Sequence, residues 1–284
     1  MRRKENSVSP GPRKPIFNLP GVILLVLAVL VAAHLVRVYI LTDAEDSYVL
    51  RAMAFVPAQF TFLWNPDAVA EMLTDLAREG RRGQLLMSQF FLGVGHQQWW
   101  TPLSYALLHA DWTHLGVNSL WLVAFGAPVA VRFGAARFLA FFAVTAAAGA
   151  GAHYGLHMAD ATPVIGASAA VSGLTAAALR FVFQPGAPLG PVPYYGPLPP
   201  DLAARQPALP ISRAWRDRRV LQFAAIWFAV NLLVGLFAVP LGIAEFGVAW
   251  EAHAGGFVAG FLFFSLFDPP HRGVHDPLPP MTDP

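Results

Sequence analysis

The chain has 284 residues, of which 56% are hydrophobic and only 13% are charged, and its mean hydropathy is +0.49. Soluble domains carry about 25% charged residues, so the composition excludes a soluble fold of this length and predicts apolar surface that faces lipid. Cysteine is absent, which excludes disulfides and thiolate-bound metals. The net charge of +2, without a Gly-rich phosphate loop or a nucleic-acid patch, argues against a nucleic-acid partner.

The N-terminal part divides into a polar and an apolar stretch. Residues 1–20 are basic and contain proline, which predicts a disordered tail. Residues 21–41 are apolar, and a run of about 20 such residues crosses a hydrocarbon core of about 30 Å. A basic start before an apolar run is also typical of a signal peptide. Because further apolar segments follow, we interpret the run as a first transmembrane helix.

A longer and more polar connection covers residues 42–100. Within it, Asn65-Pro66-Asp67 has the pattern of a helix start, with an N-cap, a proline at the first helical position and an acidic first turn. Val69 and Leu76 lie on one apolar face, and Gly80 provides a stop. The pattern predicts a short amphipathic helix at the membrane surface.

Five further apolar segments predict an all-α, polytopic bundle of six transmembrane helices within residues 21–267. They are rich in alanine and glycine, which let helices approach closely in a membrane. A proline-dense linker, residues 185–219, separates two of them, and residues 268–284 form a second polar tail. The five segments are residues 112–131, 136–158, 168–183, 220–239 and 252–267.

The distribution of arginine and lysine predicts the orientation. Cytoplasmic loops of membrane proteins carry an excess of these residues. With the N-terminus inside, the cytoplasmic segments contain the basic tail, Arg132, Arg180 and the basic run 213–219, whereas Asp160 and Glu245 fall in short outer loops. We therefore expect both termini in the cytoplasm and the connection 42–100 outside.

Four polar residues lie in or beside the apolar segments, where polar groups are costly and are functional hypotheses by default. His114 and Asn118 are four residues apart and share one helix face. Ser168 lies in Gly-Ala-Ser-Ala at the outer end of its segment, and His253 begins the last segment, followed by two glycines at helical spacing. All four fall near one depth of the membrane.

A hydroxyl beside an imidazole is a minimal activated nucleophile, because the histidine accepts the proton and later returns it to the leaving group. Each residue also has a structural interpretation. A single serine in an Ala/Gly-rich helix usually packs or bonds to its own backbone, and a single histidine at the edge of a span is usually interfacial. The combination of all four in one chain order favours catalysis.

This combination resembles the rhomboid intramembrane proteases. The resemblance rests on HADWTHLGVN (residues 109–118), on GASA around Ser168, and on Ala252-His253 followed by spaced glycines. It covers about residues 99–267 and implies a six-helix core that opens to water from the extracytoplasmic side. It also implies the membrane of residence, a bacterial inner (plasma) membrane.

The resemblance assigns roles to individual residues. Ser168 matches the nucleophile and His253 the general base and acid of a Ser–His dyad, without a metal or other cofactor. His114 and Asn118 match oxyanion-stabilising positions, together with the backbone amide of Ser168. His109 matches a family histidine that supports the loop ahead of the second span. The implied activity is that of an intramembrane serine endopeptidase, whose partners are transmembrane protein substrates and the lipid bilayer.

The sequence departs from the family pattern in three places. Trp99-Trp100 stands where many members have Trp-Arg, and Ala130 takes the place of a usual glutamate. Ser172 stands where some members have an aromatic ring that stacks on the catalytic histidine. The first two departures concern the bonding of the outer loop, and the third leaves the residue that orients His253 open.

Other interpretations remain beside the protease. A rhomboid-like protein that binds client helices without cutting them has the same scaffold but usually lacks the serine or the histidine. A small transporter is also conceivable, although no repeated half pattern of interrupted helices appears. His153 and His157, four residues apart with Asp160 just beyond, form either a metal site or, more commonly, a pair of interfacial histidines. The sequence carries no signal of oligomeric state.

Overall fold

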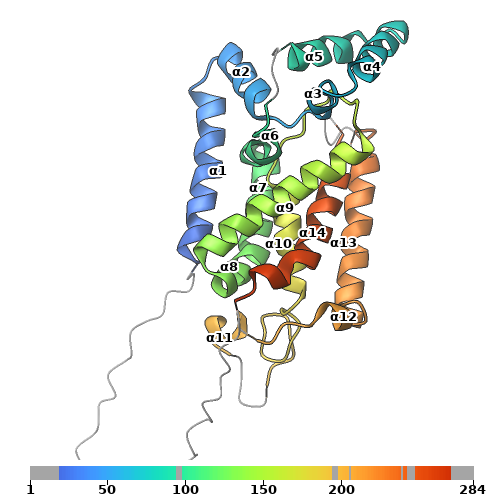
Figure 1. Cartoon of the computed structure of the whole chain (residues 1–284). Coiled ribbons are helices and arrows are strands. Elements are labelled where there is room, and N and C mark those ends of the chain that lie inside the picture. Colours follow the sequence, from blue (N-terminus) through green and yellow to red (C-terminus); the bar gives the residue numbers. More distant parts are fainter. Residues whose placement is uncertain are drawn as a thin grey trace, which may run out of the picture.

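A computed structural model describes residues 19–93, 98–193, 198–204, 206–237, 239–241 and 247–269. The predicted tails 1–20 and 268–284 lie largely outside the described residues, as does Glu245. Among the described residues, helices are joined by turns and irregular segments, and the only β-structure is one isolated bridge between Phe55 and Val164. Figure 1 shows a bundle of long helices with several short helices across one end. The prediction of an all-α membrane bundle is confirmed.

Five helical stretches among the described residues are long and apolar enough to cross a membrane. Large apolar side chains of these helices are exposed on the outside of the bundle, which is the arrangement expected of a surface covered by lipid. The five stretches are α1 (Gly21–Tyr39), α7 to α8 (Trp112–Phe133), α9 (Ala135–Leu156), α13 (Arg218–Phe237) and α14 (Trp250–Phe267).

The second stretch is not a regular α-helix along its whole length. A π-helical turn, η2 (Leu122–Gly126), separates α7 (Trp112–Trp121) from α8 (Ala127–Phe133). Pro128 lies in the first turn of α8. Proline lacks an N–H and its ring clashes with the carbonyl four residues earlier, so the widened turn accommodates it within a continuous helix.

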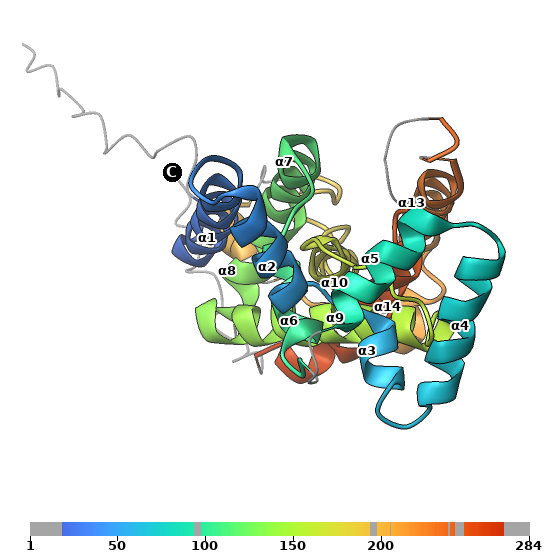
Figure 2. The same ribbon diagram turned by 90° about the horizontal axis from the view of Figure 1, so that it is seen from above.

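The predicted length of the fourth span, residues 168–183, is wrong. The helix α10 ends at Leu179 and has 12 residues, or about 18 Å at 1.5 Å per residue. The chain leaves the helix at Arg180, whose guanidinium donates to the carbonyls of Leu209 and Phe261 at 2.8 and 2.9 Å. All residues of α10 after Ser168 are buried, and Figure 2 shows α10 surrounded by the other helices.

Glycines allow α9, α10 and α14 to pack with their backbones in contact. A Cβ atom at Gly256 would collide with the carbonyl of Ala169, and one at Gly260 with the carbonyl of Gly173. On the opposite helix, a Cβ atom at Gly149 would lie 2.6 Å from the carbonyl oxygen of Ala252. This close packing brings the start of α14 next to the start of α10.

The connection 42–100 folds into short helices over one end of the bundle (Figure 1). The predicted amphipathic helix is confirmed as α4 (Pro66–Arg78), which is capped by Asn65 and buries Val69 and Leu76. The sequence analysis did not predict the others, because each is short and its polarity resembles that of a loop. They are α2 (Asp43–Met53), α3 (Pro57–Thr61) and α5 (Arg82–Leu92). Two further short elements, α6 (Thr101–Ser104) and the 3-10 turn η1 (Tyr105–Leu107), follow directly after the connection.

Two of the departures from the family pattern are at Trp100 and at Ala130, and the structure shows the surroundings of both. Trp100 Nε1 donates to the carbonyl of Ala52 at 2.8 Å and so ties the end of the connection to α2. Ala130 is buried in the core, and the nearby Arg132 pairs instead with Asp268 at 2.6 Å. Trp100 is thus held by a backbone acceptor of α2, whereas Ala130 and Arg132 belong to α8, at the end of the bundle that contacts the linker.

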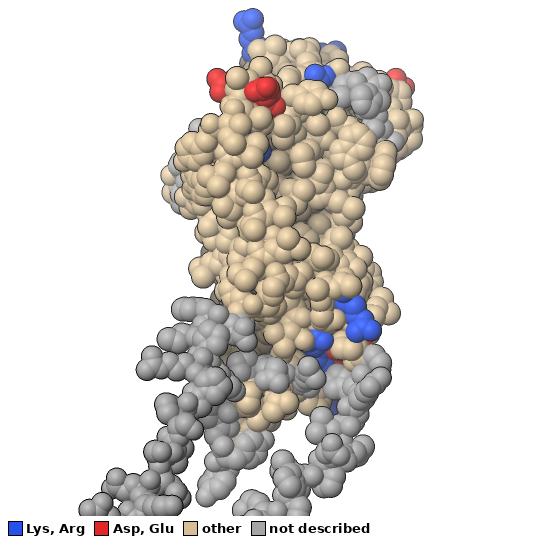
Figure 3. All heavy atoms as spheres, turned by 90° about the vertical axis from the view of Figure 1, so that its left-hand side faces the viewer, with Lys and Arg blue, Asp and Glu red and all other residues tan. Residues whose placement is uncertain are grey.

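The proline-rich linker lies at the other end of the bundle and includes α11 (Pro200–Ala204) and α12 (Ile211–Ala214). Arg132 donates to the carbonyls of Ala204 and Gln206 at 3.0 and 2.7 Å. Because a buried guanidinium needs acceptors, these bonds stabilise the linker against the helices. In Figure 3 the charged residues on the visible face gather toward the two ends of the bundle, as expected of a membrane protein.

Candidate active site

Ser168 is the first residue of α10 and follows a glycine whose backbone conformation is unusual. Gly166 has φ of +123°, a conformation that favours glycine, and its N–H donates to the carbonyl of Tyr105 at 2.9 Å. The first N–H groups of a helix lack intrahelical acceptors. Ser168 therefore combines a hydroxyl with a backbone amide available to an incoming ligand.

His114 faces the same glycine from α7. A Cβ atom at Gly166 would lie 2.7 Å from His114 Nε2 and 3.6 Å from Ser168 Oγ, so the imidazole and the hydroxyl flank one glycine. The carboxylate of Asp111 caps α7 by accepting from the backbone N–H of His114 at 2.8 Å. The N–H of Ala110 donates to His114 Nδ1 at 3.4 Å, which assigns the proton of a neutral ring to Nε2. His114 is thus a donor aimed at the Gly166 side.

Asn118 lies one turn after His114 and is buried, with 5% of its surface exposed. Its Nδ2 has no hydrogen-bond partner among the described residues. A buried amide without a partner costs about 1–3 kcal/mol, and the few such groups in a native structure commonly mark functional sites. The Asn118 amide is therefore available to donate to a bound ligand.

His253 lies in the first turns of α14, one turn before Gly256, where α14 contacts the residue after Ser168. Its Nδ1 makes a 2.8 Å hydrogen bond with Oδ1 of Asn231 in α13. Asn231 Nδ2 donates to the carbonyl of Trp227 at 2.8 Å, which assigns the orientation of the amide. Because Oδ1 only accepts, the proton of a neutral His253 lies on Nδ1, and Nε2 is left as a free base.

Asn231 is a residue that the sequence analysis missed. A signal was present, because an asparagine within an apolar span is itself a functional hypothesis. The open question of what orients His253 has its structural answer here and not in Ser172. Ser172 Oγ donates to the carbonyl of Ser168 at 2.6 Å, a bond to its own helix that is common for serine in membrane helices.

The structure brings the four predicted residues to neighbouring positions on three helices, but no hydrogen bond joins Ser168 Oγ to His253 among the described residues. In substrate-free active sites such bonds are often long and tighten only when substrate binds. His253 already has the tautomer that a general base requires, and His114 and Asn118 already present donors.

His109 supports the start of α10 from the loop before α7. It is fully buried, its Nε2 accepts a long hydrogen bond from the N–H of Ala167 at 3.5 Å, and its carbonyl accepts from Arg37 at 2.8 Å. Burial lowers the pKa of His109 to about 3, so the ring is neutral at physiological pH. The two bonds tie the loop ahead of α7 to α1 and to the start of α10.

The fold and the site together define an α-helical integral membrane protein that has a serine and a histidine on two helices that pack against each other. The family model of the rhomboid domain matches residues 96–268. The chain therefore belongs to the rhomboid family. No curated protein matches the chain.

Proposed function

We propose that the chain is an intramembrane serine endopeptidase that cleaves transmembrane segments of other proteins. The observation that carries the proposal is the hydrogen bond between His253 Nδ1 and Asn231 Oδ1, since it leaves Nε2 unprotonated on the helix that packs against Ser168. A histidine prepared in this way is suited to accept a proton from a serine hydroxyl.

In the first step Ser168 Oγ attacks the carbonyl carbon of the scissile peptide bond while His253 Nε2 accepts the hydroxyl proton. The carbonyl oxygen becomes an oxyanion. His114 Nε2–H, Asn118 Nδ2–H and the N–H of Ser168 donate to it. Each such donor lowers the barrier by about 3–4 kcal/mol in soluble proteases.

The tetrahedral intermediate then collapses to an acyl-enzyme. His253 returns the proton to the leaving amine, and the C–N bond breaks. Water attacks the ester carbonyl in the second half, with His253 again as the base, and the carboxylate product leaves as Ser168 recovers its proton. The substrate must unwind locally first, because a helix holds its carbonyls in hydrogen bonds to N–H groups four residues later.

The proposed topology has both termini in the cytoplasm of a bacterial cell and α2 to α6 on the outer side of its inner membrane. Basic residues support it, since Arg132 lies in α8, Arg137 in the first turn of α9, Arg180 directly after α10 and the run 213–219 around the α12–α13 junction, and Figure 1 shows these helix ends at the end of the bundle opposite α2 to α5. Cytoplasmic segments near membrane spans are enriched in these residues. Ser168 and His253 then lie toward the outer side.

A second candidate is a protein that binds client transmembrane helices without cutting them. The observation in its favour is that Ser168 Oγ and His253 make no hydrogen bond to each other. Both residues are nevertheless present, and so are the donors for an oxyanion, which a purely binding protein does not require. We therefore rank it second.

The test is cleavage of a fluorogenic transmembrane substrate by the purified chain in liposomes. We expect the wild type to cut and both Ser168→Ala and His253→Ala to be inactive. Ser172→Ala is the matched control, because Ser172 is a second buried serine one turn away that bonds to its own helix. We expect the Ser172→Ala protein to retain activity. The result that would favour client binding is a wild type that does not cut the substrate but still binds its helix, and whose Ser168 is not labelled by a serine-directed phosphonate.

A further inference from the structure

A second polar cluster lies near the start of α14, outside the residues used in the proposed mechanism. His153 is in the last turn of α9, His157 is the C-cap residue of α9, and Glu251 is in the first turn of α14. One ligand atom from each lies within 4.8 Å of the other two. The two imidazole rings have centroids 4.7 Å apart, so both histidines point to one side of the helix end, toward Glu251.

One member of this cluster has an unmet hydrogen-bonding need. His153 is 6% exposed, and its Nδ1 is buried without a hydrogen-bond partner. It lies 3.7 Å from Glu251 Oε2, beyond hydrogen-bond distance, while Glu251 Oε1 is 3.1 Å from His157 Nε2. A histidine–carboxylate hydrogen bond therefore accounts for His157 but not for His153. The remaining nitrogen and oxygen face each other across a gap.

The composition and spacing of the cluster match a zinc site. Two histidines and one glutamate are the protein ligands in several zinc enzymes, with a water at the fourth position, and Zn–N and Zn–O distances are about 2.0–2.2 Å. Tetrahedral ligands at these distances are separated by about 3.4 Å. The two nitrogen–oxygen distances of 3.1 and 3.7 Å lie on either side of this value. An ion in the gap would bind His153 Nδ1, His157 Nε2 and Glu251.

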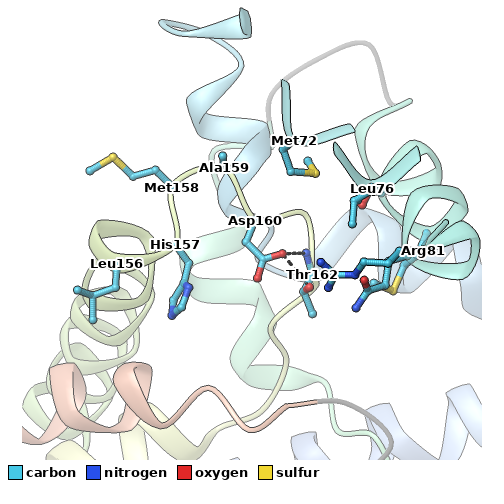
Figure 4. Close-up of a pocket in the computed structure, with 12 residues that line it drawn as sticks. Met72, Leu76, Arg81, Leu156, His157, Met158, Ala159, Asp160 and Thr162 are labelled. Carbon is cyan, nitrogen blue, oxygen red and sulfur yellow. Dashed lines mark hydrogen bonds between the residues drawn. The ribbon is translucent and has the colours of Figure 1, made fainter. Parts of the chain in front are cut away.

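The cluster borders a cavity through His157. His157 lines a cavity of about 590 Å³ between the loop after α9 and the short helices α4 and α5, and Figure 4 shows it at the edge of this cavity. Asp160, which the sequence analysis placed beside the histidines, is not the third ligand. Its Oδ1 accepts from the backbone N–H and the hydroxyl of Thr162, both at 2.8 Å.

We propose that His153, His157 and Glu251 bind Zn²⁺ and that the ion ties the outer end of α9 to the start of α14. The three ligands come from two helices that already pack with their backbones in contact through Gly149 and Ala252. Because Glu251 precedes His253 by two residues, the ion holds the segment that positions the proposed base. This inference does not depend on peptidase activity.

The experiment measures Zn²⁺ binding by calorimetry with the full chain in detergent, purified without a histidine tag, stripped with a chelator and carrying Ser168→Ala. We expect one equivalent of Zn²⁺ to bind, and His153→Gln, His157→Gln and Glu251→Gln each to weaken binding at least about tenfold. At a hundredfold excess of Zn²⁺ over Kd, the midpoint of thermal unfolding rises by about 5–10 °C.

Glu71→Gln is the matched control, since Glu71 is an exposed carboxylate on α4 and its loss leaves zinc affinity unchanged. His157 is partly exposed at the helix end, so His157→Gln is the variant best suited to retain the fold, which circular dichroism checks. A stripped Ser168→Ala protein that binds no zinc, or His157→Gln and Glu251→Gln variants that bind it as tightly as the parent Ser168→Ala protein, would overturn the proposal.

Discussion

The three-helix core of α9, α10 and α14 and the peripheral helix α13 are packed by opposite means. In the core, backbones touch at glycines, and every residue of α10 after Ser168 is buried. In α13 only Val220 is buried. Its contacts to α14 use large side chains, such as Trp227 stacked on Phe257 with ring centroids 4.5 Å apart.

The difference separates two tasks. Backbone contacts leave little freedom, because interiors are close-packed and resist displacement, so the core determines where Ser168 and the backbone of His253 lie. The ring of His253 depends instead on Asn231 in α13. A movement of the loosely held α13 would therefore change the orientation of the base without moving the nucleophile.

The largest expected effect comes from the core. Gly260→Val places a side chain against the carbonyl of Gly173, and the backbone there cannot move aside. We expect the free energy of unfolding to fall by about 3 kcal/mol or more and the activity to be lost completely. Gly151→Val in α9 is the control, because a Cβ atom there meets nothing within 4 Å. Thermal unfolding in detergent compares them, and equal midpoints would contradict the backbone-contact argument.

The next effect concerns a site residue that the core supports. Asn118→Ala removes an amide donor, and we expect kcat to fall about 10²–10³-fold. Stability should not fall, since Asn118 Nδ2 has no partner to lose. Cleavage rates and unfolding midpoints of the same preparation separate the two. A large loss of stability would show that the amide has a structural role.

A smaller effect is expected from α13. Asn231→Ala frees the ring of His253, and kcat should fall about tenfold to a hundredfold, the range seen when an orienting partner of a metal-bound histidine is removed. KM should stay the same because the side chain of Asn231 is bonded to His253 and to the carbonyl of Trp227 and so acts on the base. Asn231→Asp, which keeps an acceptor, should restore part of the rate. Val230→Ala, an exposed neighbour, is the control, and an unchanged kcat in Asn231→Ala would remove the positioning role.

The smallest effect is a pH dependence of stability from His109. Its pKa is about 3 in the folded chain and 6.5 as the ordinary value. Between these values the unfolded chain binds a proton that the folded chain does not, so stability falls as the pH drops below 6.5. At pH 5.5 the loss is about 1.4 kcal/mol. We expect His109→Gln to reduce this part of the slope in unfolding midpoints between pH 7.5 and 5.5. Identical slopes would contradict it.

Much of the candidate site could be proposed from the sequence because its signals are local. His114 and Asn118 are one helical turn apart, and Ser168 and His253 stand next to small residues. Polar residues such as these four are costly in an apolar segment, so their presence there is informative. Asn231 was not predicted, because its partner His253 is 22 residues away in the sequence. The proposed zinc ligand Glu251 was not predicted for the same reason. Asp160 is nearer to the two histidines in sequence, but it bonds to Thr162.

The sequence by itself determined that this chain enters a membrane as helices, since apolar runs without water leave the backbone no other way to satisfy its hydrogen bonds. It also determined the residues capable of chemistry. Only the tertiary structure decided that α10 stops at Leu179 and lies buried, because the acceptors of Arg180 come from the linker and α14. Likewise, the partner of His253 depends on which helix packs beside it, and that contact joins segments that no local pattern connects.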